Sequence, residues 1–316
     1  MANSKIKTVF FGSGNFAVKI LQGILKFPFL EVVAVVTQPD KPAGRKKLLT
    51  PCPVMQEIIN QGWQMPVYKP EKLKENAAEI LAATEPDFIL VADYGQFIPA
   101  AIIDYPKYKC LNVHGSLLPD LRGAVPAAMA ILKGYTKTGV SIPVMTPGLD
   151  DGDLVASAEM ELLATDTTYD VRMRLADIGN ELLLKVLPDW FTGNIKAIPQ
   201  DSNLATITKQ SDIAKENAQI TKDTDAVMAE RMVRAFSPWP IAWVEASLNG
   251  QLKRVKIISS KLEQNIQFPA GLFTKHEKQL YLGLKNGALN LGEIQVEGKN
   301  VGTGKEHLFL NNILIE

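Results

Sequence analysis

The sequence predicts an α/β domain built on a parallel sheet, followed by a smaller domain of short β-strands. Two observations support this division. In the first part of the 316 residues, near-continuous apolar runs alternate with amphipathic segments, which is typical of parallel strands covered by helices on both faces. Towards the end of the chain, short alternating segments are separated by glycine turns, which favours a small β-barrel.

The composition is ordinary for a globular protein, with 46% hydrophobic and 22% charged residues. The 34 Lys and Arg residues balance the 34 Asp and Glu residues, so net charge attracts neither nucleic acid nor a membrane surface. The first apolar run is too short for a secretory signal, and no later run approaches membrane-spanning length. The two cysteines, Cys52 and Cys110, suit a reducing compartment, so we expect a cytoplasmic protein.

The chain opens with a βαβ unit. Its parts are a strand at residues 5–11, the turn Gly12-Ser13-Gly14, a helix at residues 15–27 and a strand at residues 31–37. The glycine spacing resembles a dinucleotide-binding turn, which also expects an acid about 20 residues further on. Here the second strand ends at Thr37, and Asp40 comes late, after a proline. We therefore favour a tight turn that needs small residues over a nicotinamide site.

The remaining elements follow in order. A basic, proline-rich loop covers residues 38–53. The first domain then shows helices at 54–61, 71–84, 99–104, 124–133 and 169–191, and strands at 88–92, 110–113, 139–145 and 154–160. In the second domain a helix at 223–236 precedes strands at 242–248, 253–259, 271–274, 280–284 and 289–296. We place the first domain at residues 1–204, a polar linker at 205–216 and the second domain at 217–316.

Polar residues gather where three predicted strands end. These ends are Gly12-Ser13-Gly14, Asp93-Tyr94-Gly95 and His114-Gly115-Ser116. Ligands of open α/β sheets bind at this edge, and Asn112 shares a face of its strand with His114 because side chains alternate. The acidic turn at 147–153 could bind a metal, but it lacks the spacing of a calcium loop. One carboxylate paired with His114 is the better interpretation, and a buried structural histidine is the alternative.

The run Asn112-Val113-His114-Gly115-Ser116-Leu117-Leu118-Pro119, with Arg122-Gly123-Ala124, resembles the signature of the folate-dependent formyltransferases. The turn Gly148-Leu149-Asp150-Asp151-Gly152-Asp153 resembles their downstream aspartate motif. The resemblance implies a Rossmann-like domain, the catalytic trio Asn112, His114 and Asp150, and 10-formyltetrahydrofolate as co-substrate, without a metal. The folate contacts that it implies are Val91, Tyr94, Ser116, Leu117, Leu118 and Pro119.

Other segments resemble the members of this family that act on an aminoacyl-tRNA. Residues 37–45 are similar to a basic loop that contacts the acceptor end, and residues 234–240 and 293–299 are similar to the start and end of an OB-like barrel. The resemblance covers essentially the whole chain. It implies formyl transfer to methionyl-initiator tRNA, with no membrane and no obligate protein partner. The implied tRNA contacts are Arg45, Lys46, Lys47, Lys253 and Arg254.

The expected chemistry explains the trio. An amine that attacks the formyl carbon produces a tetrahedral oxyanion, which Asn112 and His114 can stabilise by donating hydrogen bonds. Asp150 can accept the amine proton, hold His114 or orient a water.

Several alternatives compete with this interpretation. They are a formyltransferase for an amino sugar nucleotide or a purine intermediate, a formyl-folate hydrolase, a non-catalytic RNA-binding protein and a nicotinamide oxidoreductase. The basic loop and the barrel entry argue against the other formyltransferases. The intact trio argues against a non-catalytic protein, and the missing ribose acid argues against an oxidoreductase. A hydrolase would share the trio. The chain departs from the family pattern at Asp93, Val125, Thr146-Pro147, Thr221-Lys222 and Ile241, which bear on pocket shape, tRNA affinity and substrate range.

Overall fold

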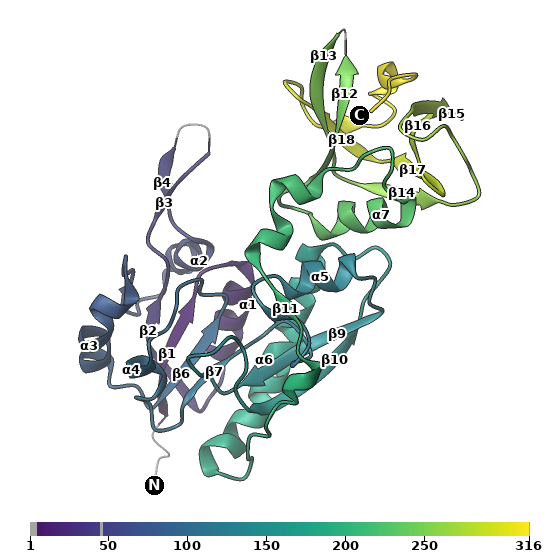
Figure 1. Ribbon diagram of the computed structural model, residues 1–316. Coiled ribbons are helices and arrows are strands. Elements are labelled where there is room, and N and C mark those ends of the chain that lie inside the picture. Colours follow the sequence, from purple (N-terminus) through teal and green to yellow (C-terminus); the bar gives the residue numbers. More distant parts are fainter. Residues whose placement is uncertain (1–4, 45–46, 249, 316) are drawn as a thin grey trace. The chain divides into compact units, whose positions relative to one another are not determined.

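The computed structural model describes residues 5–44, 47–248 and 250–315, which form two compact units (Figure 1). Unit 1 contains the chain up to residue 123, residues 138–161 and residues 172–207. Unit 2 contains residues 124–137, 162–171 and the chain from residue 208 onward. The chain therefore passes between the units several times, and the domain limits expected at residues 204 and 217 stay a prediction.

A five-stranded parallel sheet in the order β5-β2-β1-β6-β7 forms the centre of unit 1. Its strands are β1 (Ile6–Gly12), β2 (Leu30–Val36), β5 (Val67–Tyr68), β6 (Phe88–Ala92) and β7 (Cys110–Asn112). Apolar residues occupy both faces of β1 and β6, so helices must cover both. The parallel-sheet fold class is confirmed. Of the five strands in this sheet, only β5 was not predicted, because a strand of two residues is too short to show an alternating hydrophobic pattern.

Different helices cover the two faces of this sheet. The helices are α1 (Asn15–Ile24), α2 (Pro53–Gln61), α3 (Leu73–Thr84), α4 (Ala100–Ile103) and α6 (Thr168–Thr192). Val9, Phe11 and Ile89 share one face and form a core cluster with residues of α3 and α4. On the other side, Phe88 contacts Phe191 of α6, and Gly179 of α6 lies against Ile20 of α1. The alternation of side chains along each strand decides which helix each residue meets.

The loop predicted at residues 38–53 contains an antiparallel hairpin. Its strands are β3 (Lys41–Ala43) and β4 (Leu48–Thr50). Its prolines made regular structure unexpected, but strands of three residues tolerate Pro42 because they have few ladder hydrogen bonds to lose. The expected tRNA contacts Arg45 and Lys46 lie outside the described residues. Lys47 has a left-handed backbone with φ of 48° in the connecting turn.

Two further pairs of strands complete the first part of the chain. They are β9 (Lys137–Pro143) with β10 (Leu154–Glu161), and β8 (Arg122–Gly123) with β11 (Ile207–Thr208). The polar segment around residues 202–218 contains 3-10 turns rather than a featureless linker. They are η1 (Ser202–Leu204), η2 (Gln210–Ile213) and η3 (Lys215–Ala218).

Unit 2 contains two antiparallel four-stranded sheets and two helices, which confirms the predicted β-rich second part. One sheet has the order β12-β13-β18-β19 and the other has the order β14-β17-β16-β15. The strands are β12 (Ala242–Leu248), β13 (Gln251–Ile257), β14 (Ser260–Glu263), β15 (Phe273–His276), β16 (Gln279–Leu284), β17 (Gly287–Leu291), β18 (Glu293–Val296) and β19 (Gly302–Thr303). The helices are α5 (Pro126–Leu132) and α7 (Ala226–Ala235), with η4 at Leu308–Leu310.

The segment predicted as one strand at residues 289–296 is divided in the structure. Gly292 separates β17 from β18, and these strands belong to different sheets. Gly292 packs so closely on Ser259 that an added Cβ would force the Ser259 side chain to shift. The hydrophobic pattern runs through the break because both strands face one core, which includes Leu291 and Ile294.

Candidate active site

His114 lies just beyond the carboxyl end of β7 and is held there by its backbone. Its N–H donates to the carbonyl of Ser141, and Ser141 donates back to His114, each over 2.9 Å. The side chain is only 5% exposed. Asn112, two residues earlier on the same face, is half-buried. The end of the strand therefore presents both side chains to the same region.

Asp150 joins these two side chains into one group. Its Oδ1 accepts a hydrogen bond from Asn112 Nδ2 at 3.2 Å, and its Oδ2 lies 3.6 Å from His114 Nδ1. The backbone N–H of Gly123 also donates to Oδ2, at 2.8 Å. Asp150 has a left-handed backbone, with φ of 49°, which aspartate tolerates better than most residues. The structure thus brings Asp150, which lies 38 residues after Asn112, to the Asn112–His114 pair.

The contacts of the His114 ring constrain its hydrogens. Nε2 lies 3.0 Å from the carbonyl oxygen of Leu121, which can only accept, so Nε2 carries a hydrogen. Nδ1 faces the Asp150 carboxylate, which also accepts, but 3.6 Å is longer than a normal hydrogen bond. The ring is therefore held through its Nε2 hydrogen bond. The loose contact at Nδ1 is the one that a ligand atom can most easily enter.

Gln200 fixes the turn that carries Asp150, and the sequence analysis missed it. Its Nε2 donates to the carbonyls of Asp150 at 2.8 Å and Gly152 at 2.6 Å. Its Oε1 accepts from the guanidinium of Arg122, at 2.8 Å from Nη2. Gln200 comes from an aperiodic polar segment, in which no local pattern separates it from its neighbours. Only the packing of distant segments reveals its position.

The turn at residues 116–119 is held in shape by its own hydrogen bonds. Ser116 Oγ donates to the carbonyl of Asp120 at 2.6 Å. Ser141 Oγ donates to the carbonyl of Ser116 at 2.7 Å and accepts from the N–H of Leu118 at 3.0 Å. Leu117 packs so closely on Gly139 that a Cβ there would overlap it. The turn therefore keeps its form without a ligand, and Ser141 is a second residue that sequence reasoning missed.

The other two expected folate contacts, Val91 and Tyr94, are buried at the end of β6. The Tyr94 carbonyl accepts hydrogen bonds from Ser13 Oγ at 3.2 Å and Gln38 Nε2 at 3.1 Å. Its phenol group has no hydrogen-bond partner among the residues that the structure describes. Burial raises the pKa of Tyr94, so the phenol keeps its proton. The phenol is therefore a neutral group buried in the core that Tyr94 shares with residues of α3 and α4.

Asp93 follows β6 at the same edge and differs from its family pattern. Its carboxylate lies 2.5 Å from Arg172 Nη2, and its backbone is left-handed with φ of 52°. Desolvation raises the pKa of Asp93, while the Arg172 charge lowers it. Since 34% of the side chain stays exposed, water screens both effects and the ion pair contributes little to stability.

The two barrel residues expected to contact tRNA point to opposite faces of β13. Lys253 pairs with Ala246 and Arg254 pairs with Glu245, so alternation separates their side chains. Arg254 lies over the Trp243 ring at 3.9 Å from its centroid, a cation–π contact. Lys256, two residues on, shares the face of Arg254. Only one of the two expected residues therefore lies on the aromatic face of this sheet.

The chain belongs to the formyl transferase family, and its relatives and family domains indicate a formyl-transferring enzyme. The model of the formyl transferase domain matches residues 5–187. The model of the formyl transferase C-terminal domain matches residues 212–311. Together these two matches cover most of the chain.

Within the family, the chain is similar to methionyl-tRNA formyltransferases. It is 39% identical to that of Bacillus licheniformis, over 93% of this chain and 91% of the relative. It is 37% identical to that of Nitrosococcus oceani, over 95% of this chain and 91% of the relative.

Solved structures share the fold at lower identity. HypX from Aquifex aeolicus in complex with tetrahydrofolic acid matches with a TM-score of 0.67 and 17% identity, over 96% of this chain and 47% of HypX. This chain thus spans about half the length of HypX. An N-formyltransferase from Helicobacter canadensis, in complex with folinic acid and dTDP-3-aminofucose, matches with a TM-score of 0.63 and 18% identity, over 90% of this chain and 99% of that one.

Proposed function

We propose that this protein transfers the formyl group of 10-formyltetrahydrofolate to the amino group of methionyl-initiator tRNA. The observation that carries this proposal is the Asp150 carboxylate, which contacts both Asn112 and His114 at the edge of the sheet. The substrate is supported by relatives named methionyl-tRNA formyltransferase, which match more than nine-tenths of the chain.

The first chemical step is attack of the amine on the formyl carbon, which leaves negative charge on the formyl oxygen. Asn112 Nδ2 and the Nδ1 edge of His114, which is the ring nitrogen not bonded to Leu121, are the groups that would stabilise this charge. Both are held before the substrate arrives, because Asp150 fixes Asn112 and the Leu121 carbonyl fixes the ring. Preorganisation matters because donors that need not reorient cost no energy during the reaction.

The second step moves the amine proton. Asp150 Oδ2 accepts the amine proton, and this proton is then delivered to the folate nitrogen as the bond between that nitrogen and the formyl carbon breaks. An α-amino group has a pKa of about 7.7–8.0 in peptides, so it needs only modest help to become a nucleophile. Gln200 keeps Asp150 in place through the backbone carbonyl of that residue.

The folate fits between two preformed elements. The turn at residues 116–119 offers Leu117, Leu118 and Pro119 for the flat pterin face, and it is braced by Ser141. Val91 and Tyr94 have side chains that are buried in the core with α3 and α4, so we expect the backbone at the end of β6 to contact the pterin edge. The family match and the tetrahydrofolate bound to HypX support a folate here.

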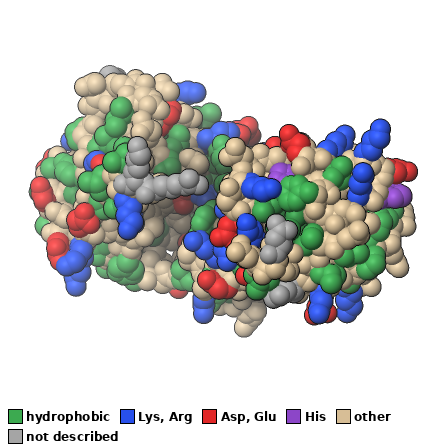
Figure 2. All heavy atoms as spheres, turned by 90° about the horizontal axis from the view of Figure 1, so that it is seen from above, with side chains coloured by type: hydrophobic (Ala, Val, Ile, Leu, Met, Phe, Trp, Pro, Cys, Tyr) green, Lys and Arg blue, Asp and Glu red, His purple; other side chains and the backbone are tan. Residues whose placement is uncertain are grey.

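The tRNA would be recognised by local groups rather than by overall charge. Lys and Arg side chains are interspersed with Asp and Glu on the face seen in Figure 2, in keeping with the zero net charge. Arg45, Lys46 and Lys47 would contact acceptor phosphates, and Lys253 and Arg254 would contact the RNA further along. Replacing phosphate-contacting residues should weaken binding and reduce its salt dependence.

The domain limits 1–204, 205–216 and 217–316 and a cytoplasmic location are proposed with this function. In the described part of the chain, no helix combines the length and apolar character needed to cross a membrane.

The function is tested with purified protein, 10-formyltetrahydrofolate and four acceptors in parallel. They are charged initiator tRNA, charged elongator tRNA, an amino sugar nucleotide and water. We expect rapid formylation of the initiator methionyl-tRNA and little release of formate. Preferred transfer to the sugar nucleotide would replace this function with that of a sugar formyltransferase, and formate release alone would indicate a hydrolase.

A further inference from the structure

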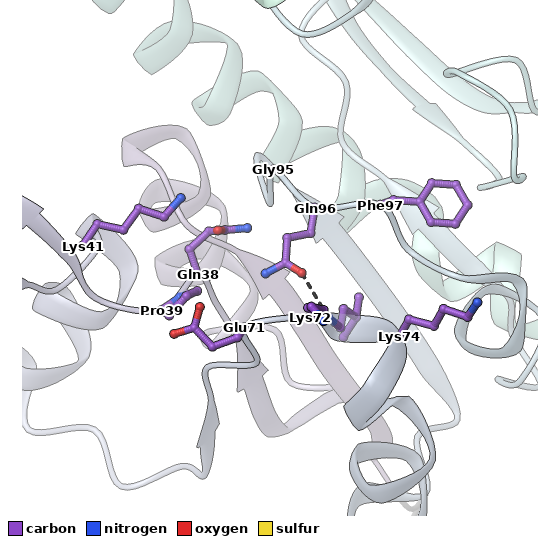
Figure 3. Close-up of a pocket in the computed structure, with 10 residues that line it drawn as sticks. Gln38, Pro39, Lys41, Glu71, Lys72, Lys74, Gly95, Gln96 and Phe97 are labelled. Atoms are coloured by element: carbon purple, nitrogen blue, oxygen red, sulfur yellow. Dashed lines mark hydrogen bonds between the residues drawn. The ribbon is translucent and has the colours of Figure 1, made fainter.

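A cavity of 530 Å³ lies at the carboxyl edge of the parallel sheet, and none of the catalytic trio lines it. Its walls come from the residues after β2, the start of α3 and the segment after β6 (Figure 3). The proposed chemistry does not use these residues, although Gln38, Pro39 and Lys41 belong to the segment 37–45 expected to contact the acceptor end of the tRNA. The residues that characterise it are Lys41, Lys72, Lys74, Glu71, Gln96 and Phe97.

Hydrogen bonds fix the walls of this cavity and connect it to the strand end beside it. Gln96 Oε1 accepts from the N–H of Leu73 at 3.1 Å, and Gln96 Nε2 donates to the carbonyl of Pro70 at 3.0 Å. On the other side, Gln38 Nε2 donates to the Tyr94 carbonyl at 3.1 Å. The cavity is therefore preformed and begins directly beside Tyr94.

The charges of the lining select an anionic ligand. Three lysines face one carboxylate, that of Glu71, which leaves an excess of two positive charges. Lys72 contacts Glu75 at 2.9 Å, but both side chains are well exposed, so the pair is weak and can be replaced. Phe97 is 70% exposed and adds an aromatic surface. In Figure 3, Lys41 reaches in from one side, and Lys74 and Phe97 lie on the other.

We propose that this cavity binds the benzoyl-glutamate tail of the folate, and that it favours folates with several γ-linked glutamates. The inference rests on the proposed function. Residues 95–97 continue directly from the strand end expected to hold the pterin, so the tail has a short path into the cavity. This tail offers an aromatic ring to Phe97 and carboxylates to the lysines, with one further carboxylate for each added glutamate.

The nature of the cations favours carboxylates over RNA phosphates at this place. All three are lysines, which act as point charges on flexible stems and can follow a chain of variable length. Phosphate recognition more often uses the bidentate fork of arginine, and the cavity lining contains no arginine among the residues that the structure describes. Replacing Glu71 with Gln should strengthen the binding of a multiply charged tail.

The test compares the binding of tetrahydrofolate with one and with five glutamates, measured by isothermal titration calorimetry at low salt. For the wild-type protein we expect the pentaglutamate to bind about tenfold more tightly, because several exposed ion pairs add small gains. Salt should reduce this ratio. In K72A/K74A the ratio should fall close to one, and in E71Q it should rise. K185A/K196A removes the same charge from exposed positions outside the cavity and should keep the wild-type ratio.

A ratio near one in the wild-type protein would overturn the proposal, and so would a ratio that K72A/K74A leaves intact. An equal loss in K185A/K196A would assign the effect to general charge and would also overturn it. If K72A/K74A instead raised the KM for methionyl-tRNA at an unchanged folate ratio, the cavity would be an RNA site. Binding is measured without transfer, so failure of formylation with a preserved ratio would reject the proposed function alone.

Discussion

Asp93 and Asp150 lie at the same edge of the parallel sheet, and both have left-handed backbones. Asp93 faces Arg172, whose charge is permanent. Asp150 faces an amide, a backbone N–H and an imidazole, whose proton can move. Under the proposed mechanism, a carboxylate at a strand end is structural or reactive according to its partner. A permanent cation neutralises it, and a titratable ring leaves it free to exchange a proton.

Asp93 also explains why the Gly12-Ser13-Gly14 turn differs from a dinucleotide site. A Cβ added at Gly14 would overlap the Asp93 carboxylate, so this side chain fills the space beside the start of α1. In dinucleotide-binding folds the pyrophosphate lies against the same helix N-terminus. Here the protein's own anion occupies that position, and Asp150 lies instead beside the end of β7, the strand next to β6 in the sheet.

The largest expected effect comes from removing the reactive carboxylate. We expect D150A to lower kcat by a factor of about 10³, because it removes the proton acceptor and releases Asn112 and His114. D150N keeps the shape and separates the two roles. If Asp150 only orients its neighbours, D150N should retain most of the activity. Formylation kinetics and a circular dichroism check of folding measure both variants. Full activity in D150A would contradict the proposed mechanism.

A smaller effect is expected when Asp150 is kept but its support is removed. Q200A should lower kcat by about tenfold to a hundredfold, because small displacements of a catalytic group are costly. Q200E is the matched variant. It can still accept from Arg122 but cannot donate to the carbonyls of Asp150 and Gly152, so it should be as slow as Q200A. Recovery of activity in Q200E would show that Gln200 acts through Arg122 instead.

Asp225 offers a third aspartate, which caps α7. It accepts from the N–H groups of Val227 and Met228, and D225A should lower the free energy of unfolding by about 1 kcal/mol. The hydrogen bond from Asn286 lowers the pKa of Asp225, helped by these backbone contacts. The stabilisation is therefore present above the usual value of 3.8 and is lost as the pH falls through the lowered pKa.

Urea unfolding at several pH values tests the cap, with D225N as the control. Asparagine caps a helix about as well as aspartate but does not titrate here, so D225N should stay stable at neutral pH and lose the acid dependence. A D225A protein as stable as the wild type would show that the cap is redundant.

The smallest effects are expected at the neutralised carboxylate. R172A should lower the free energy of unfolding by about 0.5 kcal/mol at neutral pH, because the pair is partly exposed. Without Arg172, desolvation alone acts on Asp93 and raises its pKa further above 3.8. The loss should therefore vanish at pH values below 3.8, where folded and unfolded states are both protonated, and should be complete above the raised pKa.

The variant D93A is the control for this pair. It removes the group that needs neutralising, and Arg172 keeps water contact, so it should change stability less than R172A. Formylation rates should stay within a few-fold of the wild type. A loss of activity in D93A that approached that of D150A would remove the distinction between the two aspartates.

Local patterns were enough for the main elements. Apolar runs predicted β1, β2, β6 and β7, because a strand covered on both faces must be apolar throughout. The pattern failed where elements are short, as in β5, or where prolines seem to forbid strands, as in the β3–β4 hairpin. It also joined β17 and β18, because periodicity does not register a change of sheet.

For the site, the sequence by itself determined which residues can do the chemistry, since Asn112, His114 and Asp150 stand in recognisable motifs. Only the tertiary structure decided how they are held. Gln200 meets Asp150 across 50 residues and Arg172 meets Asp93 across 79, and neither contact leaves a trace in local periodicity. The burial of side chains in one helix or strand produces a hydrophobic pattern in the residues of that element. A contact between distant segments depends instead on how the whole sheet and its helices pack.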